Sequence, residues 1–483
     1  MSGSKTPPRS LSPSRKGSIS EKGAPNKVEL LSSFPPCRRS ALLELKGHKS
    51  GAYKDLVISD DPSLETLRDN SLPTTRTYNR FEEPLKYTPA GFSTADIVAL
   101  GDFPPYDILS GVPLPEAYEG FNHETALPRP YRPFRWAYHQ TMCQFSDRRP
   151  RSIVAQTDNA AALTKMETDW WLEVDKDYCA KIAERKGLYQ KYGKLVLDYQ
   201  PGSELACKEL MEMALQFYCA RYPKHFQLSN DNTVFHNKLL NTSTIIANFH
   251  PLVVIMNNIA EDFALVLRSE ADGQYYFRAG CICSSLGWNV STKIGKSLFA
   301  IHAGIVPDYE EKMAFSMDRF FTKMPTSSPI QRGSWSLEAG APLFMPPGDP
   351  HEASRAVQAE ALRADEVTLR VDWQTLRRLP LSGAVVFNFK ALFTPLAEFR
   401  DEAYIPALVL KICKEGKENL MAYKNTWHVE HVAIPELERY AEEQREKGMV
   451  RGEKEGEEWT VETLAASPYF PGWEEKWHRQ QGF

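Results

Sequence analysis

The order in which helical and strand-like patterns follow one another predicts an α+β protein. Helical periodicity dominates residues 175–222, strand-like alternation recurs between 262 and 393, and helical patterns return after residue 395. Short turns join neighbouring strand segments, so we expect these strands to pair antiparallel. The sequence has neither G-x-G-x-x-G nor a Walker A motif, which argues against the nucleotide sites of alternating α/β folds.

The composition is typical of a globular protein with a large apolar interior. Of the 483 residues, 42% are hydrophobic and 25% are charged. The chain is long enough for two or three domains or one large elaborated domain. The net charge of −4 creates no overall basic field, so we expect no nucleic-acid partner. No apolar run approaches the roughly 18 residues that cross a bilayer, so we expect no membrane span.

Targeting and cysteine patterns favour a reducing, cytoplasmic location. The N-terminus lacks the apolar segment of a secretory signal. Eight cysteines are scattered along the chain without a C-x-x-C pair, which favours free thiols. Cys281 and Cys283 would share one face of a strand, and we interpret them as core residues rather than as a zinc site.

The N-terminal third is irregular. Residues 1–27 hold six Lys or Arg against one Glu among many Ser and Pro, and we predict a disordered basic tail. Residues 28–128 are rich in proline and predict an extended arm on the main body. Residues 129–142 combine arginines with aromatic rings, which is typical of a packed anchor. Residues 143–160 lack periodicity and predict an insertion loop.

Regular elements follow from residue 175 onward. The expected helices cover 175–192, 203–222, 291–298, 309–324, about 395–423 and 434–448. The expected strands cover 262–269, 274–280, 332–338, 366–374 and 383–393. The first two strands flank the turn Glu270–Gly273 and predict a β-hairpin. We interpret the segment "TLRRL", 375–379, as a helical turn.

The strand 366–374 has a polar face. With a period of two, Arg370, Asp372 and Gln374 lie on one side, while Val371 and Trp373 lie on the other. A solvated sheet face is one interpretation, because antiparallel sheets often expose one side. The other is a cleft wall that binds a charged or hydrogen-bonding ligand.

His302 lies in the apolar run "LFAIHAGIVPDY", 298–309. A lone histidine there is more often a core residue than a ligand. Ala303 and Gly304 leave room near the backbone, and within four residues only backbone atoms can satisfy the second ring nitrogen. A neutral imidazole beside an apolar pocket is what a haem iron takes as its proximal ligand. A second histidine pair, His428 and His431, lacks the spacing of a zinc motif, and we interpret it as a surface helix turn.

Several segments together resemble the haem-dependent oxidative N-demethylase alpha-subunit-like family, in its fungal form. The longest is "LRVDWQTLRRLPLSGAVVFNFK", 369–390. The others are "LPRPYRPFRWAYHQTM", "ALTKMETDWWLEVDKDY", "ARYPKHF", "EDFALVL", "KSLFAIHAGIVPDY", "MDRFFTKM" and "SWSLE". They extend over about 127–425. Together with the tail, the arm and the insertion predicted above, this gives the domain division 1–27, 28–128, 129–425 (insertion 143–160) and a charged helical segment 426–483.

The resemblance implies a PAS-like antiparallel sheet that binds haem b and is flanked by N- and C-terminal helices. His302 falls on the family's histidine motif and is the expected iron ligand. Arg370, Arg377 and Arg378 fall on its arginine-rich motif and are expected to pair with the haem propionates. Bacterial members show His-x-Pro-Val-Pro where this chain has His-Ala-Gly-Ile-Val-Pro307.

The resemblance also implies oxidation of a small secondary amine such as dimethylamine, with O₂ consumed and formaldehyde released. Asp372, where relatives often have Glu, is expected to hold the cationic amine, and Gln374 to contribute a polar contact. Because the sequence has no flavin, nicotinamide or iron–sulfur motif, electrons are expected from a separate flavin or Fe–S reductase. The alternative is a haem-binding PAS-like sensor or carrier without turnover.

Overall fold

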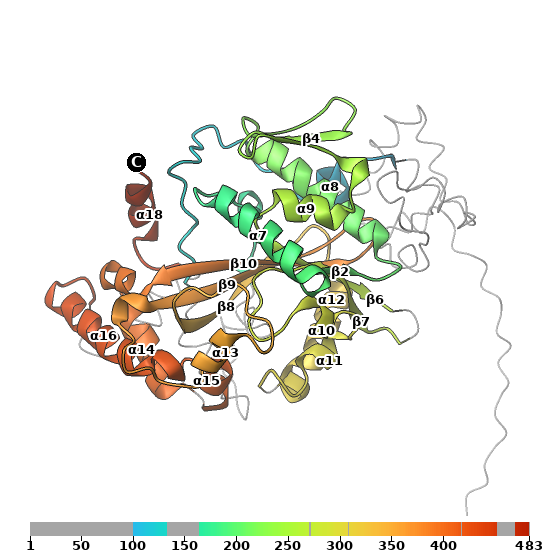
Figure 1. The fold of residues 1–483 in the computed structure, drawn as a ribbon. Coiled ribbons are helices and arrows are strands. Elements are labelled where there is room, and N and C mark those ends of the chain that lie inside the picture. Colours follow the sequence, from blue (N-terminus) through green and yellow to red (C-terminus); the bar gives the residue numbers. More distant parts are fainter. Residues whose placement is uncertain are drawn as a thin grey trace, which may run out of the picture.

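A seven-stranded antiparallel sheet organises the chain in this computed structural model (Figure 1). The structure describes residues 100–132, 164–269, 272–307, 309–416, 418–451 and 469–482. The predicted tail 1–27 and the predicted insertion 143–160 lie outside these residues. Helices pack on both sides of the sheet, so the predicted α+β class is confirmed.

The strand order in the main sheet is β1-β8-β9-β10-β6-β7-β2. Their bounds are Thr164–Lys165 (β1), Leu197–Tyr199 (β2), Asp262–Arg268 (β6), Tyr275–Cys281 (β7), Ile330–Ala339 (β8), Val367–Arg378 (β9) and Val385–Pro395 (β10). A small second sheet consists of Phe226–Leu228 (β3), Val234–Asn237 (β4) and Thr242–Ile245 (β5). Strands β6 and β7 pair antiparallel, which confirms the predicted hairpin.

The helices fall into groups along the chain. Those before or between the first strands are Tyr106–Ser110 (α5), Tyr178–Tyr192 (α7), Glu204–Arg221 (α8) and Pro251–Asn258 (α9). The central ones are Val290–Lys293 (α10), Leu298–His302 (α11), Ala314–Lys323 (α12) and Pro350–Ser354 (α13). The last are Ile405–Glu415 (α14), Glu418–Lys424 (α15), Trp427–Glu446 (α16) and Trp473–Gln481 (α18).

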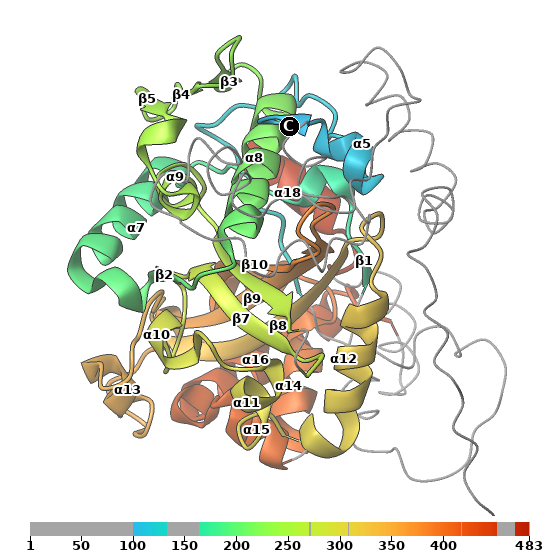
Figure 2. The ribbon, with the colours of Figure 1, turned by 90° about the vertical axis from the view of Figure 1, so that its right-hand side faces the viewer.

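The helices cover the sheet in distinct places. Figures 1 and 2 show α7, α8 and α9 above the sheet. Along β9, α14 and α16 pack on the face of Val371 and Trp373, whereas α11 and α12 pack on the opposite face, with Leu376. The largest buried cluster joins α7 to α9 with β6 and β7. A second joins α14 and α16 with β8 and β9, and a third joins α11 and α12 with β6, β7 and β10. The three clusters meet at the central strands, so both faces of β9 are buried for much of their length.

The prediction of a helical turn at "TLRRL" is wrong. Thr375–Arg378 continue β9, and each of them pairs with a residue of β10. Helical propensity in so short a segment is weak, whereas β10 pairs along the whole of it and β8 pairs as far as Leu376. As a result, period-two alternation extends through Arg377 and Arg378, which point to opposite faces of the sheet.

The described part of the predicted arm, residues 100–128, packs on the body. Tyr106 and Leu109 are buried, and the Tyr106 hydroxyl donates a hydrogen bond to Glu212 of α8 at 2.7 Å. Farther along, the Lys176 amide donates to the Ala126 carbonyl at 2.8 Å. No helix among the described residues has the length and apolarity needed to cross a bilayer.

A buried carboxylate ties distant parts of the chain together. Both oxygens of Glu402 accept hydrogen bonds from Arg132 at 2.9 Å, and Lys476 of α18 lies 3.0 Å from the same carboxylate. The Arg132 and Glu402 side chains are 3% and 0% exposed. One anion therefore fixes two cations, from residues far before and after it in the sequence, beside α16.

We predict that Glu402→Gln lowers the free energy of unfolding by about 3–5 kcal/mol, because it leaves buried Arg132 without its anion, while Lys476 keeps Asp401 at 2.6 Å. Urea denaturation measures this loss. Glu398→Gln is the matched control: Glu398 also faces Lys476, but at 3.9 Å and with a 42% exposed side chain. Its expected cost is under about 1 kcal/mol. Equal losses in the two variants would contradict the role given to Glu402.

Candidate functional site

The polar face predicted for residues 366–374 continues across three strands. Because partners in an antiparallel ladder share a face, the register places polar residues of β8 and β9 beside aromatic or small residues of β10. The three rows are Arg332–Gln374–Phe389, Ser334–Asp372–Ala391 and Ser336–Arg370–Phe393. The sheet thus presents a surface that is charged on two strands and apolar on the third.

Arg370 holds Asp372 in place. Its Nε and one terminal nitrogen donate to the same carboxylate oxygen, Oδ1, at 3.1 and 2.9 Å. Its other N–H groups donate to the carbonyls of Pro342, Leu343 and Ser284. All five donors of the guanidinium are therefore engaged inside the protein, and the side chain is 2% exposed.

Only one of the two carboxylate oxygens of Asp372 accepts a hydrogen bond from Arg370. Arg370 binds Oδ1, no hydrogen bond to Oδ2 is found among the described residues, and the side chain is 33% exposed. A carboxylate oxygen fixed at the surface of the sheet in this way is available to a cationic or hydrogen-bonding ligand. Arg370 is the residue that positions it.

Gln374 is fixed in a similar way by the neighbouring strand. Arg332 of β8 donates from Nε to Oε1 of Gln374 at 2.7 Å. This bond determines the orientation of the amide, so the Nε2 group is the donor end that remains. No acceptor for that Nε2 group is found in the part of the chain that the structure describes.

His302 is the last residue of α11. The helix begins after Ser297, whose hydroxyl accepts a hydrogen bond from the Ala300 amide. The Nδ1 atom of His302 lies 2.6 Å from the Leu298 carbonyl oxygen. Since a carbonyl only accepts, Nδ1 carries the proton and Nε2 carries the lone pair. The prediction that a backbone atom satisfies one ring nitrogen of His302 is therefore confirmed for Nδ1.

The surroundings keep the imidazole neutral and fixed. The pKa of His302 is lowered to about 4, mainly by burial, with the charges of Arg332 and Lys293 acting in the same direction and the hydrogen bond to Leu298 opposing them. Its ring stacks on buried Tyr309, with centroids 5.0 Å apart and planes at 23°. Tyr309 begins a π-helical turn, a local irregularity often found at functional sites. Gly304 takes a positive φ of +72°, so it makes the turn between these rings.

Apolar groups surround this histidine, and some of them face solvent. Phe299 is 45% exposed and Ile305 is 61% exposed. Leu298, Phe321 and Phe387 are buried in the cluster behind them. Exposed large apolar side chains beside a buried one are typical of a surface that binds an apolar partner.

Two lysines, Lys424 and Lys293, lie beside the polar face and the histidine. Burial lowers the pKa of Lys424 to about 8, although the charge of Asp372 opposes this shift. Its Nζ donates to Ser334 at 3.2 Å, which places it over β8. Burial also lowers the pKa of Lys293 to about 8, and its ammonium lies 3.7 Å from the Trp288 ring centroid. Each of these lysines would be stabilised by a nearby anion.

Two predicted arginines do not join this group. Arg377 lies on the opposite face of β9, where its guanidinium stacks on Trp171 at 4.0 Å. Arg378 lies on the same face as Asp372 but is buried, and it donates to the carbonyls of Phe321, Met324 and Gly383. Arg378 therefore anchors the end of α12 to the sheet.

The remaining sequence candidates have structural surroundings. His428 is 2% exposed, so the prediction of a surface turn is wrong for it, while His431 is partly exposed and contacts the Ala359 carbonyl. Cys281 and Cys283 are fully buried, as predicted for core residues, and both contact the Met256 sulfur. No group of three or more His, Cys, Asp or Glu arranged for a metal ion is found among the described residues.

Three site residues escaped the sequence analysis. Arg332 follows the same period as Ser334 and Ser336, so the alternation in the predicted strand 332–338 could have revealed it. Lys424 and Tyr309 carry no such signal, because their positions depend on how α15 and the π-helical turn pack against the sheet.

A comparison with protein families gives a match to most of the central part of the chain. A family model described as "Haem-dependent oxidative N-demethylase, alpha subunit-like" matches residues 162–434. The matched segment contains β8, β9 and β10, the α11 histidine and the α15 lysine, and therefore every side chain of the polar face.

We predict that His302 stays neutral down to about pH 4, because burial disfavours its imidazolium form. In the unfolded chain the same group titrates near 6.5, so the unfolded state binds the proton first as the pH falls. The stability associated with this group is complete above pH 6.5 and is lost as the pH falls toward 4.

Long-range ¹H–¹⁵N NMR measures this titration and identifies the protonated nitrogen, and His302→Gln assigns the signal. The expected spectrum has the proton on Nδ1. A midpoint near 6.5 would contradict the effect of burial, and a proton on Nε2 would move the lone pair to Nδ1, where it could not serve the site.

Proposed function

The chain belongs to the haem-dependent oxidative N-demethylase alpha-subunit-like family, whose model matches more than half of its length, and we propose that it binds haem b and demethylates a small secondary amine. The observation that carries this proposal is the neutral imidazole of His302. Its Nδ1 proton is bound by Leu298, and its Nε2 lone pair is left for an iron.

The residues around His302 fit a haem. Phe299 and Ile305 expose apolar surface, as a porphyrin edge requires, while Tyr309 holds the plane of the imidazole. In this proposal Arg332 and Lys424 pair with the haem propionates, a role that the resemblance assigned to the three arginines of β9. Arg370 and Arg378 have their donors engaged elsewhere, and they support the site by holding Asp372 and α12.

Asp372 binds the amine in this proposal. A small alkylamine is a cation at neutral pH, and a fixed carboxylate oxygen is the natural acceptor of its N–H groups. Oδ2 is that oxygen, because Arg370 engages Oδ1. Gln374, oriented by Arg332, supplies an amide donor beside it.

The overall reaction defines what the protein needs from outside. Dimethylamine, O₂, two electrons and two protons give methylamine, formaldehyde and water. Haem supplies the one-electron and dioxygen chemistry that amino-acid side chains do not perform. The chain's own residues bind the amine, orient it, and accept or return protons at Asp372. The two electrons come from a separate flavin or Fe–S reductase in this proposal.

Two finer expectations accompany the proposal. The antiparallel sheet with α10 to α12 on the His302 side is the part of the fold that would correspond to a PAS-like haem domain. A cytoplasmic location is the second expectation, and the eight scattered cysteines without a C-x-x-C pair support it.

We predict that the full chain, purified after expression with haem supply, shows a Soret band and that His302→Gln weakens haem affinity by roughly 100-fold. Haem titration followed by absorbance measures both. His431→Gln is the matched control, since this partly exposed histidine contacts only the Ala359 carbonyl. Unchanged affinity in His302→Gln would remove the ligand assignment, and a wild-type chain without a Soret band would make it a haem-free scaffold.

Turnover distinguishes an enzyme from a sensor. With dimethylamine, O₂ and a surrogate reductant, we expect formaldehyde, and we expect Asp372→Asn to lower kcat/KM by about 10–100-fold because a charged hydrogen bond is lost. Asp365→Asn is the control, because this carboxylate lies in an exposed pair with Arg363. Haem binding without formaldehyde from any of several amines would instead favour a sensor or carrier.

A further inference from the structure

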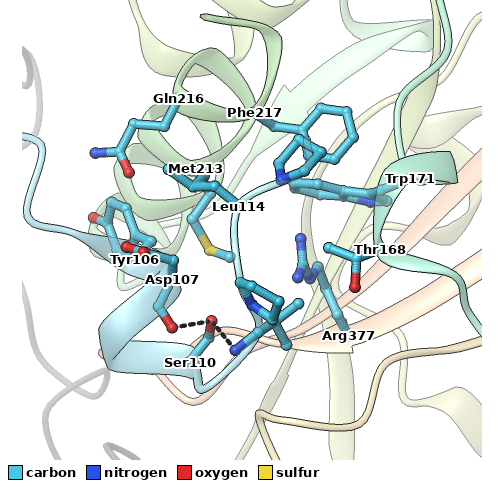
Figure 3. A pocket seen from close by; sticks show the side chains of 13 residues that line it. Tyr106, Asp107, Ser110, Leu114, Thr168, Trp171, Met213, Gln216, Phe217 and Arg377 are labelled. Atoms are coloured by element: carbon cyan, nitrogen blue, oxygen red, sulfur yellow. Dashed lines mark hydrogen bonds between the residues drawn. The ribbon is translucent and has the colours of Figure 1, made fainter. Parts of the chain in front are cut away.

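Arg377 lies in a small pocket on the face of β9 opposite to His302. Figure 3 shows its guanidinium turned toward Trp171 and Thr168, across from Met213 and Leu114. The cavity volume is about 20 Å³. That space accommodates one or two waters or a group of similar size.

The pocket wall is rigidly attached. The segment 105–115 forms one side, and α8 holds it at both ends. Gln216 donates to the Pro104 carbonyl at 2.9 Å, and Arg221 donates to the Glu116 carbonyl at 2.9 Å. The pocket is therefore a fixed feature of the fold, formed before any ligand arrives.

The charge of Arg377 has no counterion within the described residues. Arg377 is 5% exposed, and no carboxylate of that part of the chain acts on its charge. Its Nε atom is buried without a hydrogen-bond partner, as is Nε1 of Trp171 in the same wall. Burial alone lowers the pKa of Arg377 to about 9. A buried guanidinium in this condition is costly unless an anion joins it.

The nearest acids of α8 are already engaged elsewhere. Glu209 accepts hydrogen bonds from the amides of Leu381 and Ser382 at 2.6 and 2.8 Å. Glu212 accepts from Tyr106 and pairs with Lys208 at 2.5 Å. Asp107 is half-buried in the pocket lining and is not among the charges that affect Arg377. No acid among the described residues therefore neutralises Arg377, and a bound anion would do so.

We propose that this pocket binds a short-chain aliphatic monocarboxylate, with the carboxylate on Arg377 and the alkyl chain toward Leu114. A guanidinium presents parallel N–H donors that match the two oxygens of a carboxylate. The cavity volume suits the carboxylate group, and the alkyl chain extends toward the opening. Val112, Leu114 and Phe217 provide apolar contacts for the chain, and Leu114 is 41% exposed, which marks the opening.

The single cation and the small volume favour this class over a phosphate. A dianion would need a second positive group, and Asp107 of the same lining would repel it. The site is separate from the proposed haem site, since Arg377 and Gln374 leave β9 on opposite faces.

Calorimetric titration of the full chain with propionate tests the proposal, with propionamide as its neutral isostere and inorganic phosphate as the competing anion. We expect propionate to bind in the millimolar range and the other two to bind at least about tenfold more weakly. Leu114→Trp fills the opening without touching Arg377, and we expect it to weaken propionate binding by at least about tenfold. Ile245→Trp is its control, since Ile245 is 50% exposed on β5.

Arg377→Met removes the charge at similar volume and is expected to abolish binding; if it does not fold, the Leu114→Trp measurement decides. Equal binding of propionate and propionamide would overturn the proposal. Unchanged affinity in Leu114→Trp would overturn it as well, and so would no detectable binding, which would mean that part of the chain itself neutralises Arg377. Stronger phosphate than propionate binding would replace the proposed class.

Discussion

The alternation of side chains along β9 is the constraint on which both sites depend. This strand pairs with β8 and β10 over almost its whole length, so its register cannot slip without breaking two ladders. Odd-numbered residues from Val367 to Trp373 are completely buried with α14 and α16. That burial forces Arg370, Asp372 and Gln374 to the other face, and it sends Arg377 to the pocket beside Trp171.

The arginines of β9 have different roles, which depend on the hydrogen-bond partners of their guanidinium groups. Arg370 uses all five donors on Asp372 and on three carbonyls, which fixes the loops around the polar face. Arg378 binds the carbonyl end of α12 and so supports the histidine-bearing segment before it. Arg377 keeps its charge without a counterion among the described residues. A buried arginine whose N–H groups all have partners stabilises the fold. A buried arginine without a counterion indicates a place where a ligand can bind.

His302 illustrates how local geometry can be anticipated while its setting cannot. The apolar run around it and the absence of polar neighbours within four residues predicted a backbone partner, and the Leu298 carbonyl is that partner. The lone pair on Nε2 follows from this bond. Arg332 and Tyr309, however, reach the histidine only through the packing of β8 and of the π-helical turn. The alternation in β8 indicates the face on which Arg332 lies, but no pattern in the sequence indicates that Arg332 or Tyr309 lies beside the histidine.

The sequence by itself determined the α+β class, the β6–β7 hairpin, the burial of Cys281 and Cys283, and the polar side of β9. These features follow from hydrophobic periodicity, which is written in consecutive residues. It failed at "TLRRL", where pairing with β10 overrode a weak helical preference. Only the tertiary structure decided which arginines meet the histidine and which stands alone. Hydrogen-bond partners and burial are set by segments far apart in sequence, and they are what gives each guanidinium its role.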